Sequence, residues 1–448
     1  MLCIFAVYPR SLFQKGAFIL IHILNREFIA QEMQFWKIPG FAAAVIKDGQ
    51  IISCDGVGVR NITDRKAVTK DTRFAVASCT KSMTSALIAM LVDDGLLDYD
   101  VPILEYIPHF RLNDPIASFQ VTLRDLLCHR SGLGGHDGMW PAKISRAEFT
   151  RRLQYLKPNV PFRAKAQYSN IMYILIGHVA ECVTGKSWEQ LMKERIFLPL
   201  NMTESSCYTK DLYAASNHAE PYAIQNGKLY QLKPWNIDLA GPAASVNSTA
   251  GDMAKWLAMQ INGGSVNGKR LIQPATFKEM HQPQSVLEDA TGAVPGFASC
   301  HCYGFGWRIG QYRGFEVQKH RGEIEGFSSM QAYLPEQKLG VVLLTNLHAF
   351  CGHFLYTILY TAFDKLLGLP KINWAEKFHP LTQRNKFPTE LAKCDLLPDS
   401  PAADTKLSHN PKAYTGVFQN EGYGKIHITF LNDLFYLQFQ DAENLPMQ

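Results

Sequence analysis

Residues 74–92 read Phe-Ala-Val-Ala-Ser-Cys-Thr-Lys-Ser-Met-Thr-Ser-Ala-Leu-Ile-Ala-Met-Leu-Val. From about Ser78 to Val92, apolar side chains recur at helical spacing and also occupy much of the opposite side, which predicts a helix buried nearly all round. Gly95 follows as its C-terminal cap. A helix of this kind belongs in the middle of a domain, so the rest of the fold should pack around it.

Predicted strands lie on both sides of this helix in the sequence. Phe41–Ile46 and Ile51–Val59 form a hairpin joined by the turn pair Asp48-Gly49. Further strands are predicted at 305–309, 315–318, 327–334 and 339–344, and further helices at 171–183, 188–197, 250–261 and 354–367. Because strands and helices do not alternate, a parallel sheet is disfavoured. We expect an α/β (α+β) fold in which both chain ends build one antiparallel sheet, flanked by helices, with an inserted helical lobe.

The composition is that of a folded protein. The 448 residues are 47% apolar and 19% charged, and the net charge of +5 includes no long basic run. This excludes general disorder and argues against nucleic acid as the main partner. No stretch approaches the about 20 apolar residues that span a bilayer, so no membrane span is expected.

The ten cysteines are scattered and show no disulfide framework. We expect reduced thiols, which favours the cytoplasm. Cys300-His301-Cys302 resembles part of a metal site, but no second pair lies at zinc spacing. We therefore predict neither a metal nor a cofactor.

The two chain ends differ from the central region. Residues 1–32 read as a leader or a helix, with a misassigned start at Met33 as another alternative, and a signal peptide there would imply the periplasm or secretion. The main domain is expected over 33–368, followed by a proline-rich linker over 369–412. Residues 413–448 form a partial β-rich segment that either docks on the main domain or is the start of a truncated one.

Ser78-Cys79-Thr80-Lys81 is the only Ser-x-x-Lys in the chain. Residues three apart on a helix share a face, so the Lys81 amine can reach the Ser78 hydroxyl. An amine whose pKa is lowered by burial or nearby charge can take the hydroxyl proton and make serine a nucleophile. Taken alone, the pattern also fits a helix-capping serine with a solvated lysine.

Two later segments change that balance. Tyr168-Ser169-Asn170 precedes another buried helix, and His320-Arg321-Gly322 comes just before the predicted strand that begins at Phe327. Ser-x-x-Lys, then Tyr-x-Asn, then a basic residue-x-Gly is the motif order of the serine β-lactamase and penicillin-binding-protein superfamily, which this chain resembles over residues 33–368. Five other stretches are similar to its class C β-lactamase and family VIII esterase branch: 38–41, 74–78, 94–98, 126–133 and 241–249.

The resemblance implies roles for individual residues. Ser78 would be the acylated nucleophile, and Lys81 and Tyr168 would share the general-base work, each depressing the pKa of the other. The remaining candidates are His320 as a further catalytic residue, Asn170 and Arg321 as substrate-binding residues, and Gly322 and Glu323 at the oxyanion hole, where the amides of Ser78 and Glu323 would donate.

One position departs from the pattern. Where β-lactamases and transpeptidases usually carry lysine, this chain has His320, which is similar to D-aminopeptidases and esterases. We therefore expect a serine hydrolase acting on ester or amide bonds of a small-molecule or peptide substrate, rather than an efficient β-lactamase. A non-catalytic penicillin-like ligand binder and a self-assembling structural protein are the alternatives. His129 and His136, beside a glycine-rich loop, are expected to shape a turn near the pocket.

Overall fold

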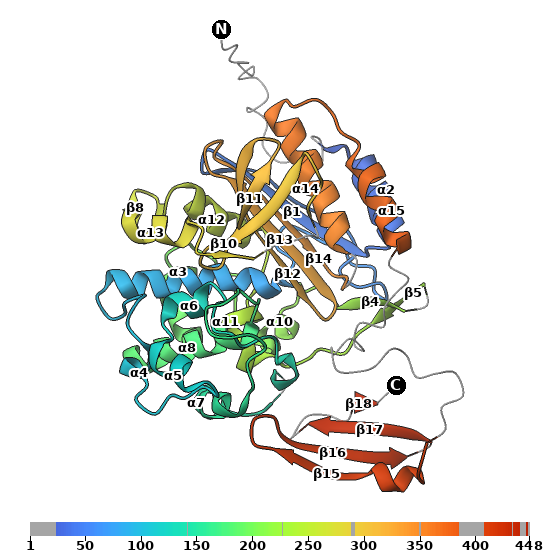
Figure 1. The fold of residues 1–448 in the computed structure, drawn as a ribbon. Helices are drawn as coiled ribbons and strands as arrows, with labels where there is room; N and C mark the ends of the chain where they lie inside the picture. Colours follow the sequence, from blue (N-terminus) through green and yellow to red (C-terminus); the bar gives the residue numbers. More distant parts are fainter. Residues whose placement is uncertain are drawn as a thin grey trace.

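The computed structural model describes residues 24–140, 142–225, 227–287, 292–348, 351–384, 407–431, 433–439 and 445–446. Its centre is an antiparallel sheet of order β2-β1-β14-β13-β12-β11-β10-β9 (Figure 1). The strands are β1 (Gly40–Lys47), β2 (Gln50–Gly58), β9 (Ser285–Val286), β10 (Ala298–Tyr303), β11 (Arg308–Tyr312), β12 (Phe315–Ile324), β13 (Phe327–Leu334) and β14 (Leu339–Thr345). Strand β1 pairs with β14 from Phe41↔Thr345 to Lys47↔Leu339. Both chain ends therefore build the sheet, as the sequence predicts.

Helices cover both faces of this sheet. On one face, α14 (Cys351–Leu367) packs against β13 and β14, with α2 (Arg26–Trp36) and α15 (Trp374–Arg384) beside it. On the other face, α12 (Ala250–Ile261) lies on β1, β2 and β14, and α3 (Thr80–Asp93) runs between the sheet and the helical lobe (Figure 1). Residues 80–91 of α3 are all buried, which confirms the predicted central helix.

The inserted lobe is helical and loop-rich. Its helices are α4 (Ile103–Tyr106), α5 (Pro115–Gln120), α6 (Leu123–Leu127), α7 (Arg146–Arg152), α8 (Asn170–Thr184), α9 (Trp188–Met192), α10 (Thr209–Ala214) and α11 (Gly241–Ala244). A further helix, α13 (Pro274–His281), packs beside α3. Short strand pairs are β3 (Phe74–Ala75) with β6 (Asn247–Ser248), β4 (Tyr222–Gln225) with β5 (Lys228–Gln231), and β7 (Ser265–Val266) with β8 (Lys269–Arg270). The β3–β6 pair places the segment after α11 beside the start of α3.

The last strands correct the predicted boundaries. β11 begins at Arg308 rather than 305, because Gly306 turns at φ +75° and a Cβ there would lie 2.7 Å from the Lys81 carbonyl oxygen. β12 continues to Ile324, so His320 lies inside a strand. β10 was not predicted. It holds Cys300-His301-Cys302 in extended conformation, and the described residues contain no group of three His, Cys, Asp or Glu side chains placed to hold a metal.

The chain ends also refine the predictions. Of residues 1–32, the structure places 26–32 in α2, which continues to Trp36, while residues 1–23 lie outside the described residues. The linker prediction over 369–412 is wrong for 374–384: Trp374 and Phe378 of α15 are each 1% exposed. These aromatic side chains pack beside α14 despite Pro380 within the helix. Residues 385–406 lie outside the described part.

The C-terminal segment forms a second antiparallel sheet. After the 3-10 turn η8 (Pro411–Tyr414) come β15 (Gly416–Asn420), β16 (Gly424–Leu431), β17 (Leu434–Phe439) and β18 (Leu445–Pro446), in that spatial order. Asp433 has φ +60° in the turn between β16 and β17. The sheet lies beside the helical lobe (Figure 1).

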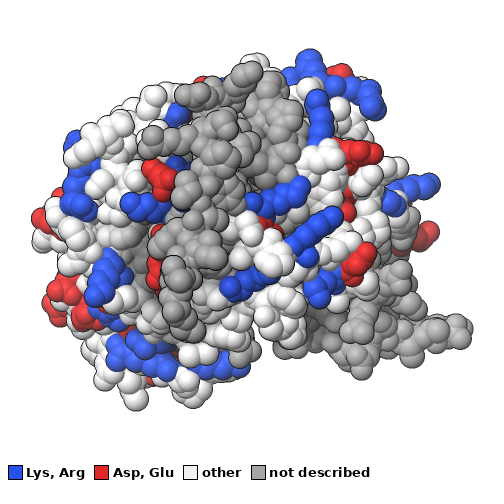
Figure 2. Space-filling model, turned by 90° about the horizontal axis from the view of Figure 1, so that it is seen from above, with Lys and Arg blue, Asp and Glu red and all other residues white. Residues whose placement is uncertain are grey.

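The described residues include no helix with the length and apolarity that crossing a bilayer requires. On the face shown in Figure 2, side chains of both charge signs lie among uncharged ones. This distribution agrees with the absence of a long basic run in the sequence.

Candidate active site

Ser78 and Lys81 lie at the start of α3. The 3-10 turn η2 (Ala77–Cys79) leads into the helix, and Ala77 has φ +46°, a conformation that costs energy for a residue with a side chain. The Lys81 Nζ donates to the Ser78 Oγ at 3.2 Å. Ser78 is partly exposed whereas Lys81 is fully buried, so a substrate can reach the hydroxyl while the amine stays out of water.

All hydrogen-bond partners of the Lys81 amine in the described residues are neutral. Besides Ser78, it donates to the Asn170 Oδ1 at 2.6 Å and to the Ala243 carbonyl oxygen at 2.9 Å. Among the described residues, no carboxylate lies within ion-pair distance of it. Burial lowers the pKa of Lys81 to about 7, the more distant Asp137 opposes this shift, and Arg308 adds to it. The amine is therefore largely uncharged just above neutral pH.

Asn170 connects this amine to an acidic residue that the sequence analysis missed. It begins α8, and its Nδ2 donates to the Asp137 Oδ1 at 3.1 Å. Asp137 starts the 3-10 turn η3 (Asp137–Met139), directly after the glycine-rich loop. The only sequence signal was its position beside that loop, because residues 137 and 170 are joined through the fold and not through a local motif.

Tyr168 packs over the same amine, with its ring centroid 4.8 Å from the Lys81 Nζ. Its hydroxyl is buried and approaches Ser78, but it forms no hydrogen bond within the described residues. Burial raises the pKa of Tyr168, and the nearby Ser78 hydroxyl and Arg308 only partly offset this effect. The expectation that Lys81 and Tyr168 depress each other's pKa is therefore wrong for the phenol, which is neutral at ordinary pH.

His129 positions Tyr168 through hydrogen bonds to the residues directly before and after it. Its carbonyl oxygen accepts from the Gln167 amide at 2.9 Å, and its Nδ1 accepts from the Ser169 amide at 3.1 Å. The two rings lie 4.5 Å apart. Because burial lowers the pKa of His129 well below its usual range, the ring is a neutral acceptor. The predicted turn-shaping role thus extends to positioning the phenol.

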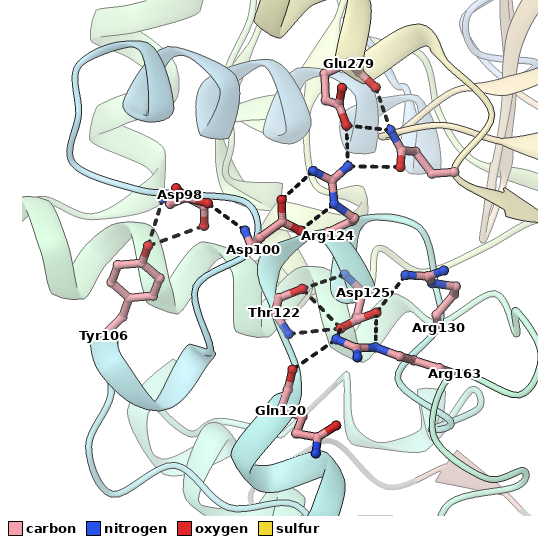
Figure 3. A network of polar contacts seen from close by, with 11 residues as sticks. Asp98, Asp100, Tyr106, Gln120, Thr122, Arg124, Asp125, Arg130, Arg163 and Glu279 are labelled. Atoms are coloured by element: carbon pink, nitrogen blue, oxygen red, sulfur yellow. Dashed lines mark hydrogen bonds and ion pairs between the residues drawn. The ribbon is translucent and has the colours of Figure 1, made fainter.

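A network of ion pairs fixes the loops that carry His129 and Tyr168 (Figure 3). The fully buried Asp125 accepts from the Arg130 Nη2 at 3.1 Å and from the Arg163 Nη2 at 2.7 Å. The Thr122 hydroxyl caps α6 by accepting from the Asp125 amide, and the Asp125 carboxylate accepts in return from the Thr122 amide. Arg130 directly follows His129, and Arg163 precedes Tyr168 in the same loop. The buried Asp125 carboxylate therefore links the two loops.

Strand β12 passes directly behind Ser78. A Cβ on Gly322 would lie 2.2 Å from the Val76 carbonyl oxygen and 3.0 Å from the Ser78 nitrogen, so only glycine allows this approach. β11 pairs with β12 no further than Lys319, whereas β13 pairs with it to Ile324. Two-residue hairpins join β12 to β11 and to β13, and they fix which backbone amides of β12 face each neighbouring strand. In this register the amide of Glu323 faces the β11 side, at a level where β11 no longer pairs with β12.

Side chains on β12 alternate between its two faces. The ring of His320 lies 6.1 Å from that of Tyr168, and its Nε2 is hydrogen-bonded to the Tyr303 hydroxyl at 2.9 Å. Its Nδ1 donates to the Arg321 carbonyl oxygen at 2.7 Å. The Arg321 side chain points to the other face, where it pairs with Glu323 at 3.1 Å. The structure therefore does not bring the Arg321 side chain to Ser78.

Arg308 and Tyr303 are further residues that the sequence analysis missed. The Arg308 guanidinium lies 5.5 Å from the centre of the Tyr168 ring and 5.8 Å from that of Tyr303. Both residues come from the neighbouring strands β10 and β11. No local motif marks them, because strand pairing alone brings them to the Tyr168 ring.

The sequence profile of the Beta-lactamase family matches residues 26–352. The chain belongs to the beta-lactamase family. It is 29% identical over 433 residues to the "Unguisins hydrolase ungD" of Aspergillus violaceofuscus, covering 89% of this chain and 75% of that protein. The predicted superfamily is thereby confirmed, and the predicted class, a serine hydrolase, agrees with this membership.

Solved structures share the fold of this beta-lactamase-family protein. The octameric penicillin-binding protein homologue from Pyrococcus abyssi has a TM-score of 0.65 at 24% identity, over 94% of this chain and 88% of that one. The D-amino acid amidase from Ochrobactrum anthropi has a TM-score of 0.63 at 23% identity, over 78% and 97%. The predicted fold class is therefore confirmed.

Proposed function

We propose that this protein hydrolyses ester or amide bonds through an acyl-serine intermediate on Ser78. The observation that carries the proposal is the buried Lys81 amine, 3.2 Å from the Ser78 hydroxyl and with a pKa of about 7. A base with a pKa near the working pH is the most effective catalyst of proton transfer. A ligand-binding protein needs no such base, which favours an enzyme over the non-catalytic alternative.

In the acylation step, the Ser78 oxygen attacks the substrate carbonyl carbon while its proton passes to the uncharged Lys81 amine. The carbonyl oxygen becomes an oxyanion, which the amides of Ser78 and Glu323 stabilise. As the bond to the leaving group breaks, the proton moves from Lys81 to that group, directly or through the Tyr168 phenol. The products of this step are the acyl-serine and the released alcohol or amine.

Deacylation repeats these transfers with water as the nucleophile. The water gives a proton to Lys81 as its oxygen attacks the acyl carbon, and the proton then returns to the Ser78 oxygen. We assign Tyr168 the role of relay and hydrogen-bond donor, because its raised pKa keeps the phenol protonated at neutral pH. Asn170 holds the Lys81 Nζ towards Ser78.

The substrate class follows from what surrounds the serine. His320 occupies the position of the usual lysine and is hydrogen-bonded to Tyr303, so it does not supply a permanent cation for a β-lactam carboxylate. Esters and amides need no such cation. The amidase with this fold makes amides of D- and L-amino acids informative test compounds.

We also propose that the protein works in a reducing compartment, which the free thiols at seven described cysteines support.

The test uses wild type, Ser78→Ala and a matched control, Ser82→Ala, which removes another hydroxyl of α3. Each is incubated with a fluorophosphonate, p-nitrophenyl esters, amino acid amides and nitrocefin, and adducts are located by mass spectrometry. We expect labelling at Ser78 and ester turnover in wild type and Ser82→Ala, little nitrocefin turnover, and neither labelling nor turnover in Ser78→Ala. Equal labelling of Ser78→Ala, or an unlabelled wild type, would contradict the proposal.

A further inference from the structure

The tip of the β15–β16 hairpin, residues 420–424, reaches the helical lobe beside the active site. The Tyr423 hydroxyl is hydrogen-bonded to the His136 Nδ1 at 2.5 Å, and the Tyr423 ring packs at the edge of the main hydrophobic core. Gly422 lies against the lobe as well, since a Cβ there would be 2.7 Å from the Leu156 Cδ2. The C-terminal sheet therefore docks on the main domain through this tip.

The tip is a defined structure rather than a loose loop. The Asn420 Oδ1 accepts from the amides of Gly422 and Tyr423 at 2.9 and 3.0 Å, which fixes the turn from within. The direction of the Tyr423 side chain is thus set by the hairpin itself. A tyrosine held in this way can restrain whatever its hydroxyl binds.

The residue that Tyr423 binds stands directly before Asp137. His136 is half-buried, has φ +50° and precedes η3. Burial lowers the pKa of His136, so its ring is neutral at ordinary pH. From Asp137 the contacts continue through the Asn170 amide, at 3.1 Å, to the Lys81 Nζ, at 2.6 Å. Three hydrogen bonds and one peptide unit separate the C-terminal hairpin from the proposed base.

We propose that Tyr423 is a positioning residue for the proposed hydrolase: by holding His136, it fixes η3 so that Asp137 and Asn170 keep the Lys81 amine directed at Ser78. The inference rests on the proposed function. The C-terminal sheet supplies none of the described contacts to Ser78 or Lys81. Through this chain of contacts it would nevertheless influence the rate of acylation.

The test measures the rate constant of Ser78 labelling by a fluorophosphonate as a function of pH, in wild type and Tyr423→Phe. The variant keeps the ring and loses only the hydroxyl. We expect the plateau rate to fall about threefold to tenfold, the range that one hydrogen bond supports. A less firmly held Asp137 stabilises the Lys81 ammonium less, so the acid limb should also move to lower pH. The titratable and charged groups around this amine are Asp137, Arg308, Cys79, Tyr168, Tyr173 and His129.

Two controls separate positioning from general loosening of the C-terminal segment. Tyr414→Phe removes a hydroxyl that binds only Ser408 and His409 in the described residues, and it should label at the wild-type rate. His136→Ala should slow labelling, and Tyr423→Phe should slow it no further in that background.

Three outcomes would overturn the inference: a wild-type rate and pH profile in Tyr423→Phe, an equal loss in Tyr414→Phe, or effects of Tyr423→Phe and His136→Ala that multiply. Failure of the proposed function gives a different result, because wild type itself would then carry no label on Ser78.

Discussion

Two buried ionisable groups on opposite faces of the central sheet, Asp364 and Lys81, have opposite kinds of partners. On the α14 face, Asp364 is 3% exposed, and its carboxylate accepts from the Tyr312 hydroxyl at 2.5 Å, the Arg313 Nη1 at 2.6 Å and the Trp374 Nε1 at 2.8 Å. On the α3 face, Lys81 is 0% exposed and has only neutral oxygen acceptors within hydrogen-bonding distance.

The difference separates a structural group from a reactive one. Removing a buried carboxylate that accepts several hydrogen bonds leaves buried donors with fewer acceptors. For Lys81, burial without a carboxylate partner lowers the pKa to about 7. Such a group costs folding free energy and is retained where its chemistry is needed. We therefore expect changes at Lys81 to affect activity and changes at Asp364 to affect stability.

The largest expected effect is on catalysis. Lys81→Met should lower kcat/KM for a p-nitrophenyl ester by about 10³-fold, the upper part of the range for losing a general base. Lys319→Met is the matched control, because Lys319 is also buried but donates to the Tyr356 hydroxyl on the α14 face. Its kcat/KM should stay within about threefold of wild type. Similar losses in both variants would contradict a specific role for the Lys81 amine.

The second effect concerns the unfolding free energy. Asp364→Ala leaves the buried Trp374 indole N–H without its acceptor. It also removes one of two acceptors from the Tyr312 hydroxyl and from the Arg313 guanidinium. We therefore expect a loss of about 2–4 kcal/mol in urea unfolding. Asp364→Asn keeps one acceptor oxygen and should lose less. The kcat/KM of the folded protein should stay unchanged in both. A stable but inactive Asp364→Ala would show that the α14 face also takes part in catalysis.

The third effect is a pair of opposite shifts in the pH dependence. Asp137 raises the pKa of Lys81 and Arg308 lowers it. Asp137→Asn should therefore move the acid limb of kcat/KM to lower pH, and Arg308→Met should move it to higher pH, each by less than about one unit. Shifts in the same direction, or none, would mean that the limb reports another group.

Local patterns account for the parts of the fold that sequence predicted well. β13 has the predicted bounds because its β-rich residues lie between two turns. α12 has the predicted bounds because the Thr249 side chain caps its start. The motifs also supplied Ser78, Lys81, Tyr168 and Asn170, which the structure brings together. In contrast, α15 was missed because its polar residues and Pro380 resemble a linker, although Trp374 and Phe378 are buried.

The rest of the site depends on contacts between distant segments. Asp137, Tyr303 and Arg308 reach the candidate site from a loop and two strands, and no spacing in the sequence connects them to Ser78. The raised pKa of Tyr168 was likewise not predictable, because it results from burial. The sequence identified the candidate reacting groups, whereas the fold determines which of them is charged.

The most direct test of this account is the protonation state of Lys81 itself. The protein is labelled with 15N at the lysine Nζ atoms, and the Lys81 resonance is assigned by its absence in Lys81→Met and followed by NMR as the pH is raised. The account predicts a titration midpoint near pH 7, well below that of the exposed lysines. A midpoint near the ordinary lysine value of about 10.4 would contradict it, because the amine would then be charged at the pH where it must accept the serine proton.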